Sequence, residues 1–271
     1  MKPNKRHGAG DALRAYIYTI PKAGTYLMDE YLTQLGMTPT GWHVSMTHYL
    51  DTRQFDADTN RVQPSRTSVP RSYLGTLKNV PAGGHAFGHF SPSYIPPALM
   101  QSLNYRIVAV RRHPKEVLVS EFIDFRHRRS DVHFVSEATV PDPAHAFEIY
   151  LREHGPVIKN ICANYALLKD LHLNHFYQEL VGRHRFIFAD FRTFIDTKRG
   201  GDTALRIAEF LGIDLPQDEV LARWRAALDA DNKTKSDTVQ LPYARESLWT
   251  PTALQIYKDL GLAAMESHLG Y

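Results

Sequence analysis

The feature that most constrains the fold is an alternation of short apolar runs with amphipathic segments, and it begins near the N-terminus. Residues 15–20 (AYIYTI) are apolar, aromatic or β-branched, which is typical of a buried strand. A Pro-Lys-Ala-Gly turn follows, and apolar residues at helical spacing then predict a helix over residues 25–35, ending at Gly36. This order of elements predicts a βα unit, from which parallel α/β sheets are built.

The same alternation continues along the chain. Further strands are predicted over residues 42–46, 85–90, 106–110 and 185–189, and helices over 92–103, 114–123, 144–173, 202–211, 217–228 and 251–269. Gly155-Pro156 predicts an interruption within the range 144–173, because proline removes a backbone hydrogen bond. We therefore expect an α/β fold in which helices cover a central, mostly parallel sheet.

Length and composition fit one globular domain. A chain of 271 residues is compatible with a single large α/β domain, and 43% hydrophobic against 23% charged residues supply a substantial core. Polar stretches interrupt the pattern as an insertion at about 48–84, with one short helix near 73–80, and as loops at about 126–143 and 229–249. We expect residues 1–271 to form one domain that carries these insertions.

Charge and cysteine content exclude several classes of protein. Lys and Arg number 32 against 29 Asp and Glu, which is too even for a nucleic-acid-binding domain and leaves a mild preference for anionic ligands. The single Cys162 excludes an intrachain disulfide and a multi-cysteine metal site. No apolar run has the length of a signal sequence or of a membrane span. We expect a cytoplasmic protein with no transmembrane segment and no nucleic-acid partner.

The turn after the first strand has the residues of an anion-binding loop. Gly24 lets the backbone approach a ligand closely, and the N–H groups of Ala23 to Tyr26 stand at the start of a helix whose dipole favours negative charge. Lys22 adds a cation and Thr25 a hydroxyl. The loop lacks the GxxxxGK[ST] pattern, and with it the Ser or Thr that holds Mg²⁺ in P-loop enzymes. The other interpretation is an ordinary βα turn with a surface lysine.

A second candidate anion site follows the strand predicted at 106–110. Arg112 leaves the end of that strand, Pro114 begins the next helix, and Ser120 lies two turns into it. Because open α/β sheets bind ligands at the carboxyl ends of their strands, Arg112 and Ser120 are expected to converge on one anion. The alternative is local pairing of Arg112 with Glu116, with Ser120 facing solvent or the core.

Together the two segments resemble the sulfotransferase family that uses 3′-phosphoadenosine 5′-phosphosulfate (PAPS). The loop from Pro21 to Thr25 is similar to the family's Pro-Lys-Ser/Ala-Gly-Thr loop, which binds the 5′-phosphosulfate. Arg112-His-Pro, with Ser120 eight positions after the arginine, is similar to its 3′-phosphate motif. His89, in a Gly-His-Phe segment, precedes Arg112 where many members carry the catalytic histidine.

The resemblance covers most of residues 15–213. Residues 186–191 are similar to the family's strand ending in an acidic residue, and residues 206–212 to its Ile-x-x-Phe-Leu-Gly helix. It implies a three-layer α/β sandwich with the P-loop NTPase-like architecture of sulfotransferases. It also implies transfer of the sulfuryl group of PAPS to a hydroxyl or amine of an acceptor, with no metal required.

The resemblance also implies roles for individual residues. His89 is the expected general base, and Lys22 is expected to stabilise the leaving phosphate. Residues 22–26 are expected to hold the 5′-phosphosulfate. Arg112 and Ser120 are expected to hold the 3′-phosphate.

Three positions depart from the family's pattern. Cytosolic members carry a Trp that stacks on adenine, whereas this chain has Tyr26 and then Leu27. Phe87 replaces the lysine expected two residues before the histidine. The family's Arg-Lys-Gly loop has no counterpart, and Lys233 and Lys235 are the candidates to replace it, although a solvated charge run explains them as well. The chain is therefore not a close match to the cytosolic detoxifying enzymes.

The acceptor pocket is expected between the long loops, because they flank the sheet edge where His89 emerges. The basic cluster at residues 126–129 favours a glycan or glycolipid acceptor, whereas Tyr73 and Tyr94 favour a small phenol, lipid or alcohol. Two other classes of protein stay open, a P-loop-type kinase-like phosphoryl transferase and a non-catalytic nucleotide-binding protein. A homodimer is also compatible with the sequence.

Overall fold

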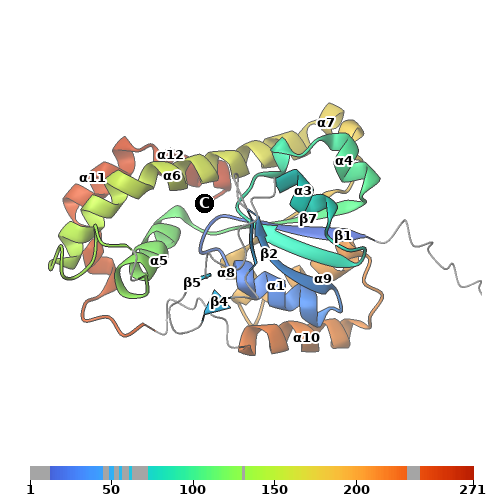
Figure 1. Cartoon of the computed structure of the whole chain (residues 1–271), viewed down its shortest axis with the longest axis horizontal. Coiled ribbons are helices and arrows are strands. Elements are labelled where there is room, and N and C mark those ends of the chain that lie inside the picture. Colours follow the sequence, from blue (N-terminus) through green and yellow to red (C-terminus); the bar gives the residue numbers. More distant parts are fainter. Residues whose placement is uncertain are drawn as a thin grey trace, which may run out of the picture.

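The computed structural model describes residues 13–44, 49–51, 55–56, 61–62, 73–129, 132–230 and 239–271. At its centre lies a six-stranded sheet in the order β3-β2-β6-β1-β7-β8 (Figure 1). These strands are β1 (Arg14–Thr19), β2 (Thr38–Val44), β3 (Tyr49–Asp51), β6 (Gly84–Gly88), β7 (Tyr105–Arg111) and β8 (Phe186–Asp190). All neighbours pair in parallel except β3, which runs antiparallel to β2. The expected mostly parallel sheet is confirmed.

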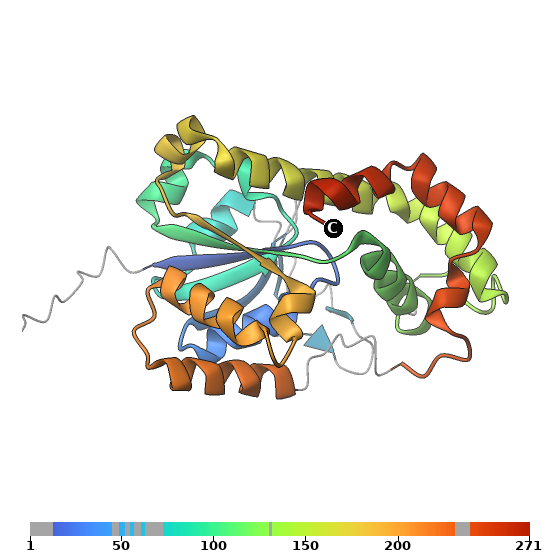
Figure 2. The ribbon, with the colours of Figure 1, turned by 180° about the vertical axis from the view of Figure 1, so that it is seen from behind.

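Helices cover both faces of the sheet and make a three-layer molecule (Figures 1 and 2). One face packs against α1 (Thr25–Gln34), α8 (Phe191–Ile195), α9 (Gly200–Leu211) and α10 (Gln217–Asp229). The other packs against α3 (Tyr73–Lys78), α4 (Pro97–Ser102), α5 (Pro114–His127), α6 (Pro143–Leu173), α7 (His175–Val181), α11 (Pro251–Asp259) and α12 (Leu262–Leu269). Short 3₁₀ turns, η2 (Pro92–Tyr94) and η4 (Arg245–Leu248), and a small hairpin of β4 (Phe55–Asp56) and β5 (Arg61–Val62) complete the elements.

The sequence of β1 explains its central place. Tyr16 and Tyr18 belong to the core on the α6 side, and Ala15 and Ile17 belong to the core on the α1 side. Successive side chains of a strand point to opposite faces, so a strand that is apolar throughout must be covered on both faces. The helices on the two sides of the sheet provide that cover.

The predicted interruption of the long helix is wrong. α6 continues through Pro156 for 31 residues. Proline removes one hydrogen bond, but α6 packs against α5, α11 and α12, and these tertiary contacts offset the loss. Gly155 allows close packing here, because a Cβ at this position would lie 2.6 Å from Leu260 Cδ1 and the leucine side chain would have to shift.

Two other predicted helices are each divided in two. The range 92–103 forms η2 and α4, because the residue before a proline avoids helical dihedrals and Pro96 is followed by Pro97. The range 251–269 forms α11 and α12, which meet at Gly261 with φ of 74°. The short helices α7 and α8 were not predicted.

The long loops are described in part. The insertion at about 48–84 contains β3, the β4–β5 hairpin and the expected short helix α3. α5 extends to His127, so the loop expected from residue 126 begins slightly later. Lys233 and Lys235 lie outside the described residues. In the described ranges, no helix combines the length and apolar character that crossing a bilayer requires.

Candidate active site

The loop between β1 and α1 begins with a tight turn. The N–H of Ala23 donates to the carbonyl oxygen of Ile20 (3.1 Å), which closes a turn with Pro21 second and Lys22 third. Lys22 has φ of 57°, the left-handed conformation that the third position of a type II turn requires and that glycine usually provides. The turn itself thus uses the Ala23 N–H as a donor, and the expectation that this group also faces a ligand stays a prediction.

The start of α1 keeps the other expected donors. Gly24 precedes the helix with φ of 84°, and the first helical hydrogen bond runs from the N–H of Met28 to the carbonyl oxygen of Gly24 (2.9 Å). The N–H groups of Thr25 and Tyr26 thus stand at the open end of the helix, where the helix dipole favours an anion. This end of α1 has the local structure of an anion-binding loop.

Arg112 brings the two predicted anion-binding segments together. Its Nη1 donates to the carbonyl oxygen of Lys22 (2.8 Å), and its Nε contacts Glu116 Oε2 (3.1 Å). The local pairing with Glu116 is thus present beside the contact with the lysine loop. Ser120 lies two turns into α5 and is 2% exposed, so its hydroxyl is shielded from bulk water.

Phe191 fills the space between these segments, a position that the sequence analysis did not identify. A Cβ on Gly24 would lie 2.5 Å from the Phe191 ring, so only glycine fits there without a shift of the ring. The guanidinium carbon of Arg112 lies 4.8 Å from the centre of the same ring. Phe191 therefore sets the distance between the glycine turn and Arg112.

His89 lies beside the anion-binding loop because of the sheet register. β1 and β6 pair in parallel with Tyr18 opposite Gly88, so the next residues, Thr19 and His89, are neighbours. Thr19 Oγ1 lies 2.7 Å from Thr25 Oγ1 and 3.1 Å from His89 Nδ1. One hydroxyl thus connects the loop to the histidine.

The backbone fixes the tautomer of His89. Its Nδ1 lies 2.8 Å from the carbonyl oxygen of Thr19, and a carbonyl oxygen only accepts hydrogen bonds. Nδ1 therefore carries the hydrogen in the neutral ring, and Nε2 carries the lone pair. Burial lowers the pKa of His89, while the Thr19 carbonyl and the charge of Glu121 oppose this shift. The imidazole is accordingly neutral at pH 7 and has its basic nitrogen at Nε2.

Lys22 pairs with a carboxylate that the sequence analysis did not identify. Its Nζ lies 3.4 Å from Asp124 Oδ1, and both side chains are largely buried. Burial lowers the pKa of Lys22, while the Asp124 carboxylate opposes this shift. Asp124 is one helical turn after Ser120, and this i, i+4 spacing is the signal that places both on one face of α5.

A second carboxylate, Glu121, lies in a buried network between α5 and α6. The Tyr150 hydroxyl donates to Glu121 Oε2 (2.8 Å), and His154 Nε2 lies 3.4 Å from the same oxygen. Burial raises the pKa of Glu121, but these two neighbours outweigh burial and lower it below its usual value. Glu121 is thus a buried negative charge within electrostatic reach of His89.

Two of the positions that depart from the family's pattern pack inward. Leu27 belongs to the core beneath α1. The ring of Tyr26 meets Phe87 edge-on at 5.5 Å between centroids, and burial raises the pKa of its hydroxyl to about 12. Phe87, at the place of the expected lysine, is itself fully buried. These residues therefore build the wall under the loop.

Two arginines of the basic cluster at 126–129 bind groups of the protein itself. Arg126 is 7% exposed, and its Nη1 donates to the carbonyl oxygens of Val135 (2.7 Å) and Val140 (2.9 Å). Arg128 faces the carboxylate of Asp124 at 3.7 Å. These contacts close the loop after α5 and engage Arg126 and Arg128 within the protein itself, while the acceptor expected from the cluster stays a prediction.

Comparisons with known proteins agree with the fold. A family model described as a sulfotransferase domain matches residues 14–250. The mouse sulfotransferase SULT7A1 complexed with PAP is a solved structure of similar fold, with 15% identity, a TM-score of 0.54 and coverage of 95% of this chain and 88% of that chain. A retinol dehydratase in complex with androsterone and inactive cofactor PAP has 14% identity, a TM-score of 0.50 and coverage of 91% and 80%. No curated protein sequence matches significantly.

Proposed function

The chain belongs to the sulfotransferase domain family, and from this premise we propose that it moves the sulfuryl group of PAPS to a hydroxyl or an amine of a small acceptor. The observation that carries the proposal is the 2.8 Å hydrogen bond from Arg112 to the carbonyl oxygen of Lys22. It holds the two anion-binding segments at one edge of the sheet. PAPS carries anionic groups at its 5′ and 3′ positions, so it needs two such segments close together.

The proposed nucleotide contacts follow from this arrangement. The N–H groups of Thr25 and Tyr26, the Thr25 hydroxyl and Lys22 hold the 5′-phosphosulfate. Arg112 and Ser120 hold the 3′-phosphate, which carries about −1.5 to −2 charge near pH 7. The solved structures of similar fold contain PAP, which is PAPS without its sulfuryl group, and this supports the proposed donor.

In the proposed reaction, His89 is the general base. Nε2 takes the proton of the acceptor hydroxyl or amine as the acceptor atom forms a bond to sulfur. The bond from sulfur to the bridging oxygen breaks, and its electron pair stays on the phosphate. The Nδ1–H bond to the Thr19 carbonyl oxygen supports this role, because it leaves the lone pair on Nε2.

Lys22 is proposed to stabilise the negative charge that grows on the departing phosphate. Its ammonium faces Asp124 at 3.4 Å, so the nucleotide and the Asp124 carboxylate compete for the same cation. A buried lysine with one carboxylate partner is already desolvated, and its charge acts on a nearby anion with little screening by water. Lys22 therefore stabilises the phosphosulfate more strongly than a surface lysine would.

A kinase-like phosphoryl transferase is the second candidate function for the same loop. It requires Mg²⁺, whereas the proposed sulfuryl transfer needs only the cations of Lys22 and Arg112. Titration of PAP with and without Mg²⁺ separates the two. Equal affinities support sulfuryl transfer, and strong dependence on Mg²⁺ favours the kinase-like enzyme.

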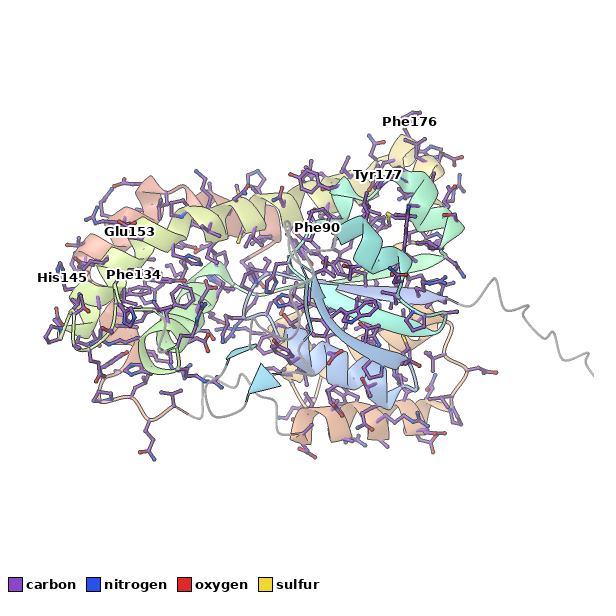
Figure 3. The ribbon with its side chains drawn as sticks, viewed as in Figure 1. Phe90, Phe134, His145, Glu153, Phe176 and Tyr177 are labelled. Atoms are coloured by element: carbon purple, nitrogen blue, oxygen red, sulfur yellow. The ribbon has the colours of Figure 1, made fainter. Side chains whose placement is uncertain are left out.

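The direct test is turnover of labelled PAPS with a panel of phenols, alcohols and amines. We expect His89→Ala to lower kcat by about 10²–10⁴-fold and to leave the affinity for PAP nearly unchanged. His145→Ala is the matched control, because His145 is 63% exposed on its side chain and lies at the far end of α6 (Figure 3). Wild-type turnover in the His89 variant, or no sulfuryl transfer to any acceptor by the native protein, contradicts the proposal.

A further inference from the structure

A cavity lies at the free edge of the sheet, beside β8. Its volume is about 310 Å³, and its walls come from β7, β8, α6, α8 and α9. β8 is the last strand of the sheet, and Figure 2 shows it between α6 on one side and α9 on the other. Among the residues that line the cavity are Arg111, Lys169, Phe188, Asp190, Thr203 and Arg206.

The cavity uses different side chains from the candidate active site. Arg111 and Asp190 stand opposite each other in the register of β7 and β8, and both line the cavity. The residues that come after them, Arg112 and Phe191, contact each other in the candidate active site instead. None of the residues that line the cavity is among those that form the candidate active site. The two sites are therefore built from different side chains and meet only at the strand ends.

Two cations of the cavity are unmatched. Arg111 already has partners, the Asp190 carboxylate at 3.5 Å and the Tyr271 ring at 4.8 Å. Lys169 and Arg206, in contrast, have no hydrogen bond or ion pair with any residue in the described part of the chain. One carboxylate among three cations leaves an excess of two positive charges around the cavity.

Polar and apolar parts of the wall lie side by side. The Thr203 hydroxyl, like the two cations, makes no side-chain hydrogen bond within the described ranges, so it is available to a ligand as a donor. Phe188 lines the same cavity and meets Tyr165 edge-on at 5.8 Å between ring centroids, which gives an aromatic wall. Small-molecule sites combine an apolar wall with a few converging polar groups, and begin at about 300 Å³.

We propose that this cavity binds a small organic anion, whose oxyanion group contacts Lys169 and Arg206 and whose planar apolar body lies against Phe188. Phosphate, sulfate and carboxylate esters or acids share this chemistry, because the two side chains offer positive charge and N–H donors to any of them. The ligand is distinct from the nucleotide, which is proposed to bind across the Lys22 loop and Arg112.

The test is a calorimetric titration of the full chain with 2-naphthyl phosphate in the presence of saturating PAP. We expect one molecule to bind per chain, and we expect Lys169→Met/Arg206→Met to weaken binding by at least about tenfold, since the variant removes two charged hydrogen bonds to the ligand. Lys159→Met/Arg225→Met is the matched control, because it removes the same charge from exposed positions of α6 and α10 that are outside the cavity. It should bind like the native protein.

Three results overturn the proposal: no saturable binding, equal weakening in both double variants, or competition between 2-naphthyl phosphate and PAP. Inorganic phosphate and 2-naphthoate, titrated in parallel, distinguish which anionic group the cavity prefers. Circular dichroism shows whether each variant is folded, and Lys169→Gln alone provides a milder change if the double variant is not. If the native protein does not bind PAP, that result contradicts the proposed function. The comparison of the same variants with 2-naphthyl phosphate still tests the cavity.

Discussion

His89 is held by its neighbours in the state that a general base needs. The Thr19 carbonyl oxygen accepts the hydrogen of Nδ1, and burial keeps the pKa of the ring below its usual value. The hydrogen bond to the Thr19 carbonyl oxygen and the charge of Glu121 both oppose the effect of burial on this pKa, whereas the charge of Lys22 adds to it. Burial, the backbone carbonyl and the nearby charges together set the proton affinity of the ring.

This balance predicts a specific pH dependence. Protonated His89 cannot accept a proton, so kcat should fall as the pH falls through its pKa, with a midpoint below 6.5. Glu121→Gln removes the charge that favours the imidazolium, so the acid limb should move to still lower pH. Glu153→Gln, an exposed carboxylate on α6 (Figure 3), should leave the profile unchanged. If the acid limb of the pH profile stays in place or moves to higher pH in the Glu121 variant, a group other than His89 titrates.

Arg112 is proposed to distinguish a 3′-phosphorylated nucleotide from one without that phosphate. We expect Arg112→Met to weaken the binding of PAP by about 10–100-fold, which corresponds to the loss of a charged hydrogen bond, and to weaken the binding of AMP much less. The comparison of PAP with AMP matters because Arg112 also supports the Lys22 loop, and a loosened loop would weaken the binding of both nucleotides. Equal losses for PAP and AMP, measured by calorimetry, contradict the proposed role.

Single residues also show where sequence reasoning ends. Lys22, Thr25 and Arg112 were predicted from local patterns, because loops after parallel strands collect at one edge of a sheet, and His89 was predicted from the family resemblance. Asp124 and Phe191 were not found, since their contacts with the loop come from α5 and α8 and arise only when the chain folds.

Among the elements, α1 lies between two glycines with positive φ, whose surroundings differ. Gly24 precedes the helix with φ of 84°, and Gly36 follows it with φ of 94°. A Cβ on Gly24 would meet the Phe191 ring at 2.5 Å, whereas a Cβ on Gly36 would meet nothing within 4 Å. The pair therefore separates the cost of backbone strain from the cost of a steric clash.

We expect Gly36→Ala to lower the free energy of unfolding by about 1–2 kcal/mol, from strain alone. Gly24→Ala should lower it by roughly 1–3 kcal/mol more, because the ring must move, and it should also weaken PAP binding. Urea denaturation of both variants measures the difference. Phe191→Ala in the Gly24→Ala background should recover part of the loss, and equal effects of the two single variants would show that the ring moves freely.

Element boundaries were predictable where local signals were strong. The strand over 15–20 and the helix over 25–35 match β1 and α1 to within one residue at each end, because proline and glycine mark their limits. Local signals misled at Pro156, where packing from three other helices keeps α6 continuous. Proline shows that a hydrogen bond is missing, and tertiary contacts decide whether the helix breaks.

On the scale of the whole molecule, we propose that residues 1–271 form one cooperative domain. The sheet joins β1, β6, β7 and β8 from distant parts of the sequence, and α11 and α12 near the end of the chain pack on α6. The alternation of strands and helices predicted this architecture. The order of the strands was beyond the sequence, because it depends on which crossover each helix makes.

One cooperative domain predicts a single thermal transition. PAP at 100 times its Kd should stabilise the fold by about 2.7 kcal/mol, so the whole transition should move to higher temperature. Differential scanning calorimetry measures this, with AMP as the nucleotide that lacks the 3′-phosphate. Two transitions, of which PAP moves only one, would show that the chain contains two independent units.

The hydroxyl of Thr19 has a consequence for the order of events. It lies between the Thr25 hydroxyl and His89 Nδ1, and it has one hydrogen to give. When Thr25 donates its hydrogen to a bound phosphosulfate, Thr19 must supply the hydrogen between the two threonines, and only its lone pairs then face the imidazole. In the proposed reaction, arrival of the donor thus reinforces the protonation of Nδ1 and leaves the lone pair on Nε2, so we expect the nucleotide to bind first and the acceptor second.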